Sequence, residues 1–160
     1  MKAASVAIIK KDLKHRSPEE LAQLVLRLAK FKKENKELLT YLLFEADHEE
    51  GYIEIIKSEI NEQFSAITSR NYYYIKKSVR KILRETKKLI RYSGNKETEV
   101  ILLLHFCEKL KEFKPSISRN TTLRNLYDRQ IELIARRISA LHEDLQFDYL
   151  KELEALQTVK

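Results

Sequence analysis

The sequence is poor in the residues that make turns. It has two glycines and two prolines in 160 residues, against average usage of about 7% and 5%. Because these residues mark hairpins and tight turns, their scarcity argues against a strand-rich fold. Alanine, leucine, glutamate, lysine, arginine and isoleucine dominate the sequence instead, and most of them favour helices. We therefore expect an all-α protein.

Cysteine and long apolar runs are also scarce. Cys107 is the only cysteine, so no intrachain disulfide can form and a reducing compartment is the simplest interpretation. The apolar run 3–9 is short, lacks a small-residue cleavage pattern and is followed by Lys10 and Lys11, so we do not expect a signal peptide. No stretch approaches the roughly 20 apolar residues of a membrane span. These features predict a cytoplasmic protein without a membrane partner.

The remaining composition is that of a folded chain. The sequence is 43% hydrophobic and 34% charged, which is too apolar for intrinsic disorder. Residues 1–16 are basic and weakly patterned, so we predict a flexible N-terminal arm or a short helix there. Residues 17–157 are predicted to form a single helical domain. The favoured architecture is a single irregular antiparallel bundle of about six helices, and a short α-solenoid of helix pairs is the alternative.

Apolar periodicity and capping residues divide this domain into helices. Ser17 and Glu20 have the spacing of a capping box, which predicts a helix start. The segment 36–46 has almost no polar face, so we predict a largely buried helix there. A helix starting near Thr121 carries apolar residues at alternating steps of four and three. This last helix either continues towards the C-terminus or bends near Leu145, and its heptad-like seam suits packing against another helix.

One segment carries most of the positive charge of the chain. Residues 70–91 contain nine basic residues against one acid, Glu85, and their net charge of +8 exceeds the +7 of the whole chain. The segment has helical periodicity and ends before Gly94, which can take the left-handed conformation of a helix cap. At roughly 100° per residue, most of the bases project to the side opposite the apolar stripe. The candidate residues for binding a polyanion or a protein partner are Lys77, Arg80, Lys81, Arg84, Lys88 and Arg91.

A neighbouring acidic segment offers a different explanation for this charge. Residues 45–62 contain seven acids and one base, for a net charge of −6. If the two segments form an antiparallel hairpin, the acidic one neutralises part of the basic helix 70–91 within the same molecule. The flanking charges would then be ordinary surface pairs, worth well under about 1 kcal/mol each.

Two classes of function follow from these patterns. The leading hypothesis is a non-catalytic binding or scaffold protein that engages an acidic protein surface, or a second copy of itself through the apolar seam on the last helix. The alternative is sequence-nonspecific nucleic-acid binding through residues 70–91. Such binding would depend strongly on salt, and the tyrosines at 72–74 would stack on bases where they are exposed.

Residues that could carry chemistry form no complete site. Glu45 and His48 have the Glu-x-x-His spacing of di-iron helical bundles, but such a site needs a second copy, which the sequence lacks. His105 and Cys107 are two residues apart, so on a helix they point to different faces. There is no glycine-rich phosphate loop and no metal-spaced Cys/His cluster. We predict no catalytic residue, cofactor or metal, and a metal-dependent bundle enzyme using Glu45 and His48 is the remote alternative.

Three stretches of the chain resemble a family of small helical bacterial proteins to which no activity is assigned. The stretches are 28–52 (LAKFKKENKELLTYLLFEADHEEGY), 73–109 (YYIKKSVRKILRETKKLIRYSGNKETEVILLLHFCEK) and 141–150 (LHEDLQFDYL). The similarity extends over most of the chain, from about Pro18 to Leu150. It implies a free-standing cytoplasmic protein of bacteria and brings no functional residue with it.

Overall fold

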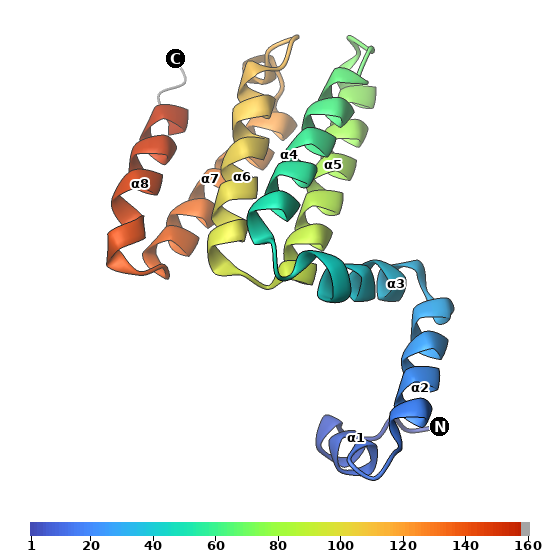
Figure 1. Cartoon of the computed structure of the whole chain (residues 1–160). Coiled ribbons are helices and arrows are strands. Elements are labelled where there is room, and N and C mark those ends of the chain that lie inside the picture. Colours follow the sequence, from blue (N-terminus) through green and yellow to red (C-terminus); the bar gives the residue numbers. More distant parts are fainter. Residues whose placement is uncertain (158–160) are drawn as a thin grey trace. The chain divides into compact units, whose positions relative to one another are not determined.

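The computed structural model describes residues 1–157, and this part of the chain is helical with no strand (Figure 1). The all-α prediction is confirmed. The described residues fall into two compact units, Met1–Phe44 and Glu45–Lys160, of which the structure describes 45–157. From the sequence we expected a boundary after residue 16, and the two units meet after Phe44. Of the two alternatives for residues 1–16, the short helix is present, as Val6–Leu13. No helix in the described chain is both long and apolar enough to cross a membrane.

The first unit consists of three short helices and the beginning of a π-helical turn. Its elements are α1 (Val6–Leu13), α2 (Pro18–Phe31), α3 (Lys33–Thr40) and the turn η1 (Tyr41–Glu45), which ends at the first residue of the second unit. The predicted capping box begins α2, since the Ser17 side chain accepts from the Glu20 amide and the Glu20 carboxylate accepts from the Ser17 amide. Within this unit α2 packs against α3.

The first unit has almost no apolar core. Ala29 and Tyr41 are its only buried residues. The helix predicted over 36–46 is present as α3 and the π-helical turn. The prediction that it is largely buried is wrong, because Leu38, Leu42 and Leu43 are exposed. The large apolar side chains that this unit leaves exposed are Met1, Val6, Ile8, Ile9, Leu13, Leu24, Val25, Leu26, Leu28, Phe31, Leu38, Leu42, Leu43 and Phe44.

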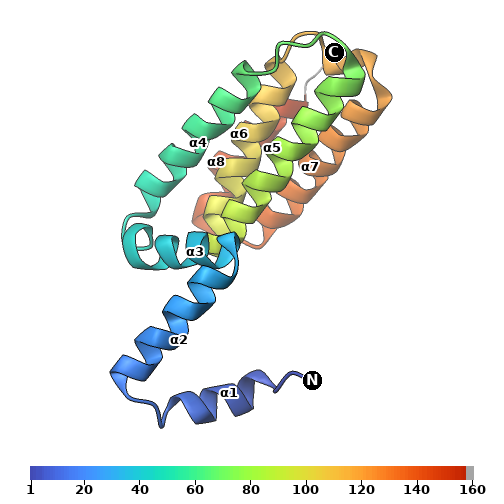
Figure 2. The ribbon, with the colours of Figure 1, turned by 90° about the vertical axis from the view of Figure 1, so that its right-hand side faces the viewer.

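The second unit is an array of five helices in two layers. Its elements are α4 (Glu49–Ser65), α5 (Tyr72–Ser93), α6 (Lys96–Glu112), a 3-10 turn η2 (Ile117–Arg119), α7 (Thr121–Ser139) and α8 (Glu143–Gln157). Figures 1 and 2 show that successive helices alternate between the layers, with α4, α6 and α8 in one and α5 and α7 in the other. Helix α6 packs against all four of the others. The core of the unit therefore lies around α6.

The α6 side chains that form this core are almost completely shielded from water. Leu103, Phe106 and Leu110 have no exposed surface, and the Phe106 ring lies 5.6 Å from that of Phe64 on α4, measured between centroids. Burying a large apolar side chain is worth about 1.5–3 kcal/mol. Because one helix supplies contacts to four neighbours, these residues hold the array together.

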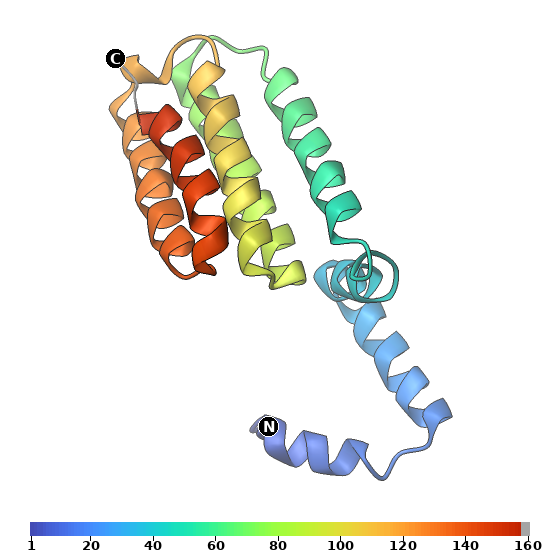
Figure 3. The ribbon, with the colours of Figure 1, turned by 60° about the vertical axis from the view of Figure 1, so that its left-hand side comes forward.

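The predicted last helix is divided into α7 and α8. The break lies at residues 140–142, a few residues before Leu145, and α8 returns beside α7 at the outer end of the array (Figure 3). The Tyr127 hydroxyl on α7 donates to the Leu156 carbonyl oxygen on α8 at 2.8 Å. Ile131, Ile134 and the rest of the predicted seam on α7 are buried inside the unit. That seam is therefore not available to a second copy of the chain.

Candidate binding groove between α5 and α7

The basic segment forms the longest helix of the chain. Helix α5 begins after Asn71, whose side chain accepts from the Tyr73 amide at 2.9 Å, and ends at Gly94, which takes the left-handed conformation with φ of 65°. Its buried side is the predicted apolar stripe, from Ile75 to Ile90. The opposite side carries the basic residues, so local capping and amphipathicity together present these charges to solvent.

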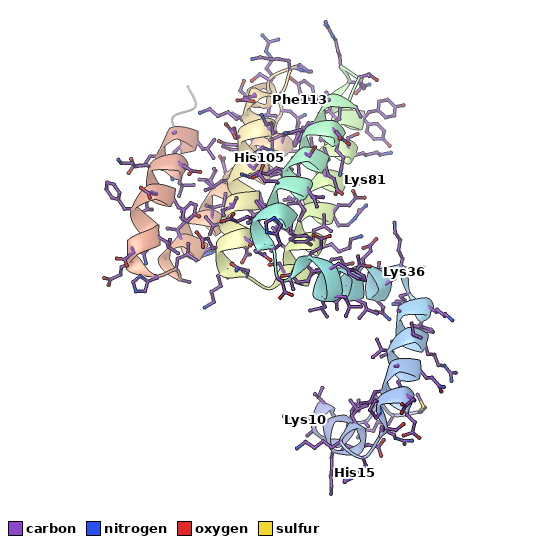
Figure 4. All side chains as sticks on the ribbon, in the orientation of Figure 1. Lys10, His15, Lys36, Lys81, His105 and Phe113 are labelled. Atoms are coloured by element: carbon purple, nitrogen blue, oxygen red, sulfur yellow. The ribbon has the colours of Figure 1, made fainter. Side chains whose placement is uncertain are left out.

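The six candidate residues divide into two groups around α5. At roughly 100° per residue, Arg80, Arg84 and Arg91 lie on the flank nearest α7. Lys77, Lys81 and Lys88 lie on the other flank, where Lys77 and Lys81 are exposed and Lys88 is half-buried. Lys81 projects away from the array in Figure 4. The Lys77 ammonium lies 4.3 Å from the centroid of the Tyr73 ring.

A groove of about 580 Å³ lies beside the first group. It exists because α5 and α7 both pack on α6 and have little direct contact with each other. Leu83, Ile90 and Leu133 form an apolar floor. The charged residues that line it are Arg80, Arg84, Lys87, Arg91, Glu99 and Arg137. Five cations therefore surround an apolar surface with one carboxylate among them.

The charge of the groove is only weakly compensated. The Arg137 Nε donates to the Glu99 Oε1 at 2.9 Å, so the single carboxylate already has a cationic partner. Lys87 is half-buried beside it, and partial burial lowers the pKa of this amine, an effect that the nearby Glu99 carboxylate opposes. Burial deprives the Lys87 ammonium of part of its hydration. An anionic group bound in the groove would stabilise the charged ammonium in place of the lost water.

Five of the six candidate cations on α5 have no ion-pair partner in the described structure. Among residues 1–157, no ion pair within 4.0 Å involves any of the five exposed α5 candidates: Lys77, Arg80, Lys81, Arg84 and Arg91. The acids of α4 have other roles. Glu54 pairs with Lys57 on the same helix, and Glu49 accepts from the Thr98 and Ser93 hydroxyls. These five cations are therefore exposed and take part in no ion pair within residues 1–157.

The other candidate residues do not combine into a reactive site. Glu45 ends the π-helical turn whereas His48 precedes α4, so the two do not share a helix. Within the described chain, no group of three or more His, Cys, Asp or Glu side chains could hold a metal ion. Cys107 is fully buried, and burial raises the pKa of its thiol to about 12. His105 instead lies within hydrogen-bonding distance, 2.8 Å, of the Asn61 side-chain oxygen.

Sequence reasoning missed two of the five cations of the groove, Lys87 and Arg137. Lys87 belongs to the basic segment, and its helical position between the apolar stripe and the arginines could have identified it as a groove residue. Arg137 lies on α7, and no local pattern connects it with α5. Only the packing of both helices on α6 brings the two residues to one surface.

Comparison with known proteins adds no relative: no family model, curated protein or solved structure matches the chain. The function must therefore be argued from the groove and the surfaces around it.

Proposed function

We propose that the protein is a non-catalytic binding protein that holds an acidic, amphipathic segment of another protein in the groove between α5 and α7. The observation that carries this proposal is the combination of five cations with an apolar floor. Arginine binds carboxylates through two parallel hydrogen bonds, which gives both affinity and orientation. An apolar floor adds the burial that a purely electrostatic site lacks.

The dimensions of the groove suit a helical ligand. Arg91 lies eleven residues after Arg80 on α5, a distance of about 16.5 Å along the axis at 1.5 Å per residue. This is about three helical turns, the length over which an amphipathic helix presents apolar residues at i, i+3, i+4 and i+7 to a hydrophobic groove. Acidic residues beside that apolar face would meet Arg84 and Arg137. The cationic rim would also speed association by electrostatic steering.

Nucleic-acid binding is the second candidate, and it rests on a different part of α5. Tyr73 and Tyr74 are 56% and 55% exposed, and both lie one turn before the outward-facing Lys77. Exposed aromatic rings beside cations are the elements of single-strand binding. The aliphatic floor of the groove offers no such stacking surface, so we rank this candidate second.

The alternating layers bear on the architecture and the setting of this function. We infer that the second unit is a short α-solenoid of helix pairs rather than an antiparallel bundle of six helices, since α4, α6 and α8 lie in one layer and α5 and α7 in the other. Such arrays commonly bind other proteins along extended surfaces.

The buried, unreactive Cys107 suits our expectation of a reducing, cytoplasmic setting.

The test is fluorescence anisotropy with three labelled probes: a leucine- and glutamate-rich amphipathic peptide, single-stranded RNA and duplex DNA. We compare the Arg80→Glu/Arg84→Glu variant, which alters the groove, with Lys77→Glu/Lys81→Glu. Both pairs change the net charge equally on the same helix. We expect Arg80→Glu/Arg84→Glu to weaken the affinity for the peptide at least tenfold. Lys77→Glu/Lys81→Glu should weaken it much less.

Two outcomes would overturn the proposal. If both variants weaken the peptide equally, the charge of α5 acts without the groove. If RNA or DNA binds more tightly than the peptide and Lys77→Glu/Lys81→Glu abolishes that binding, the nucleic-acid candidate takes its place. Circular dichroism of each variant establishes that the helices are retained.

A further inference from the structure

The first unit has a second apolar groove, between α2 and α3. It has a volume of about 230 Å³, and Leu28, Leu38 and Leu42 are among the residues that line it. Leu28 is 61% exposed and Leu42 is 56% exposed. Contiguous exposed apolar surface of this kind marks interaction sites in soluble proteins. With so few buried residues, the first unit gains stability chiefly when this surface is covered.

The charge of the first unit restricts what can cover it. Residues 1–44 contain ten lysines and arginines against five acids, a net charge of +5. Pairing this surface with the same surface of a second copy would bring like charges together, which costs free energy. The complementary surface should therefore be apolar and acidic.

The outer side of α8 has both properties. Phe147 is 64% exposed and lies on the side opposite the buried Leu156, whereas Leu150 is 42% exposed and lies on the flank next to the buried Leu153. The helix carries five acids and one base, Lys151, for a net charge of −4. At 1.5 Å per residue the 15 residues of α8 extend about 22 Å and the 14 residues of α2 about 21 Å. The two surfaces thus agree in length and are opposite in charge.

We propose that the groove between α2 and α3 of one copy receives the outer face of α8 from a second copy. Phe147 is the anchor, since exposed aromatic side chains entering apolar pockets dominate many interfaces. The Lys151 ammonium lies 4.4 Å from the centroid of the Phe147 ring, so docking replaces a solvent-exposed cation–π contact with burial. The contact joins two different surfaces, so it is head-to-tail and propagates from copy to copy.

The test measures mass by sedimentation velocity over a range of concentrations. The groove variant is Leu28→Asp/Leu42→Asp, and the helix variant is Phe147→Asp/Leu150→Asp. All four positions are exposed, so the second unit keeps its core in both. We expect the wild-type mass to rise with concentration and to fall with added salt. Each variant alone should sediment as a monomer.

Mixing the two variants gives the sharpest result. A head-to-tail contact leaves one intact groove on one variant and one intact α8 on the other, so an equimolar mixture should form dimers and stop there. A mixture that stays monomeric while the wild type associates would overturn the proposal in favour of a symmetric contact. A wild type that remains monomeric at every concentration would overturn it as well.

Two further experiments distinguish self-association from lipid binding and from peptide binding. Binding of a monomeric wild type to vesicles of phosphatidylserine and phosphatidylcholine, lost in Leu28→Asp/Leu42→Asp, would show that a lipid surface covers the first unit and would overturn the proposal. The Arg80→Glu/Arg84→Glu variant should associate like the wild type. Failure of peptide binding in the groove between α5 and α7 is thereby distinguished from failure of self-association.

Discussion

Arg137 on α7 and Glu99 on α6 form an ion pair at the edge of the groove between α5 and α7, with 2.9 Å between Nε and Oε1. The Arg137 side chain is 49% exposed and that of Glu99 22%. A pair so accessible to water contributes about 0–1 kcal/mol to folding. Its main effect is on the charge of the groove, because Glu99 is the one acid in a lining that holds five cations.

Replacing this acid should strengthen binding while changing stability little. In Glu99→Gln we expect the free energy of unfolding to fall by less than about 1 kcal/mol. Removing the carboxylate releases Arg137 for an incoming anion, so the acidic peptide should bind roughly two- to tenfold more tightly. Anisotropy and urea denaturation measure the two effects. Weaker peptide binding by this variant would show that Glu99 contacts the ligand favourably or that the ligand lies elsewhere.

Lys87 should make stability depend on pH in the alkaline range. Partial burial lowers the pKa of Lys87 in the folded chain below the ordinary value of 10.5. At pH values between the lowered pKa and 10.5, the unfolded chain therefore binds the proton more readily than the folded one. Stability therefore rises as the pH increases from the lowered value towards 10.5. Lys87→Met should be more stable than the wild type at pH 7, and the difference should shrink towards pH 10. Urea denaturation at several pH values measures it, and a less stable variant at pH 7 would mean that Glu99 outweighs desolvation.

Thr98 should stabilise the start of α4 through Glu49. The Thr98 hydroxyl, which is almost fully buried, donates to the Glu49 carboxylate at 2.6 Å. Thr98→Val keeps the shape but removes the donor, so we expect a loss of about 1–3 kcal/mol in the free energy of unfolding. A double-mutant cycle with Glu49→Gln isolates the interaction. Strictly additive losses in that cycle would show that the hydrogen bond contributes nothing.

Local features of the fold were predictable from the sequence because they depend on neighbouring residues. The capping box at Ser17 and the left-handed cap at Gly94 require only residues within one turn, and both occur as predicted. The two sides of the basic helix also follow from the helical repeat alone. The break between α7 and α8 was harder to place, since apolar residues continue through Leu141 and Leu145 without a glycine or proline.

Features that depend on long-range packing were not predictable. Periodicity shows that a side of a helix is apolar, but not whether another helix covers it. Ile134 is fully buried and Leu42 is 56% exposed, although both belong to strongly apolar patterns. Arg137 belongs to the groove only because α7 lies beside α6. The charge of α5 was therefore found from the sequence, but its apolar floor was not.

His105 should reduce stability in mild acid. Burial lowers its pKa below the ordinary value of 6.5, with the nearby lysines Lys57 and Lys109 acting in the same direction and Glu108 opposing them. The unfolded chain therefore binds a proton more readily, and stability that is complete above about pH 6.5 is lost as the pH falls towards the lowered value.

The slope from this one group cannot exceed about 1.4 kcal/mol per pH unit. His105→Gln should remove its share of the slope between pH 7 and pH 5, because glutamine does not titrate. Urea denaturation at half-unit steps measures the slope, and proton NMR of the imidazole follows the histidine directly. The same acid slope in wild type and variant would assign the effect to other groups. An imidazole that titrates at or above 6.5 would show that Glu108 outweighs burial.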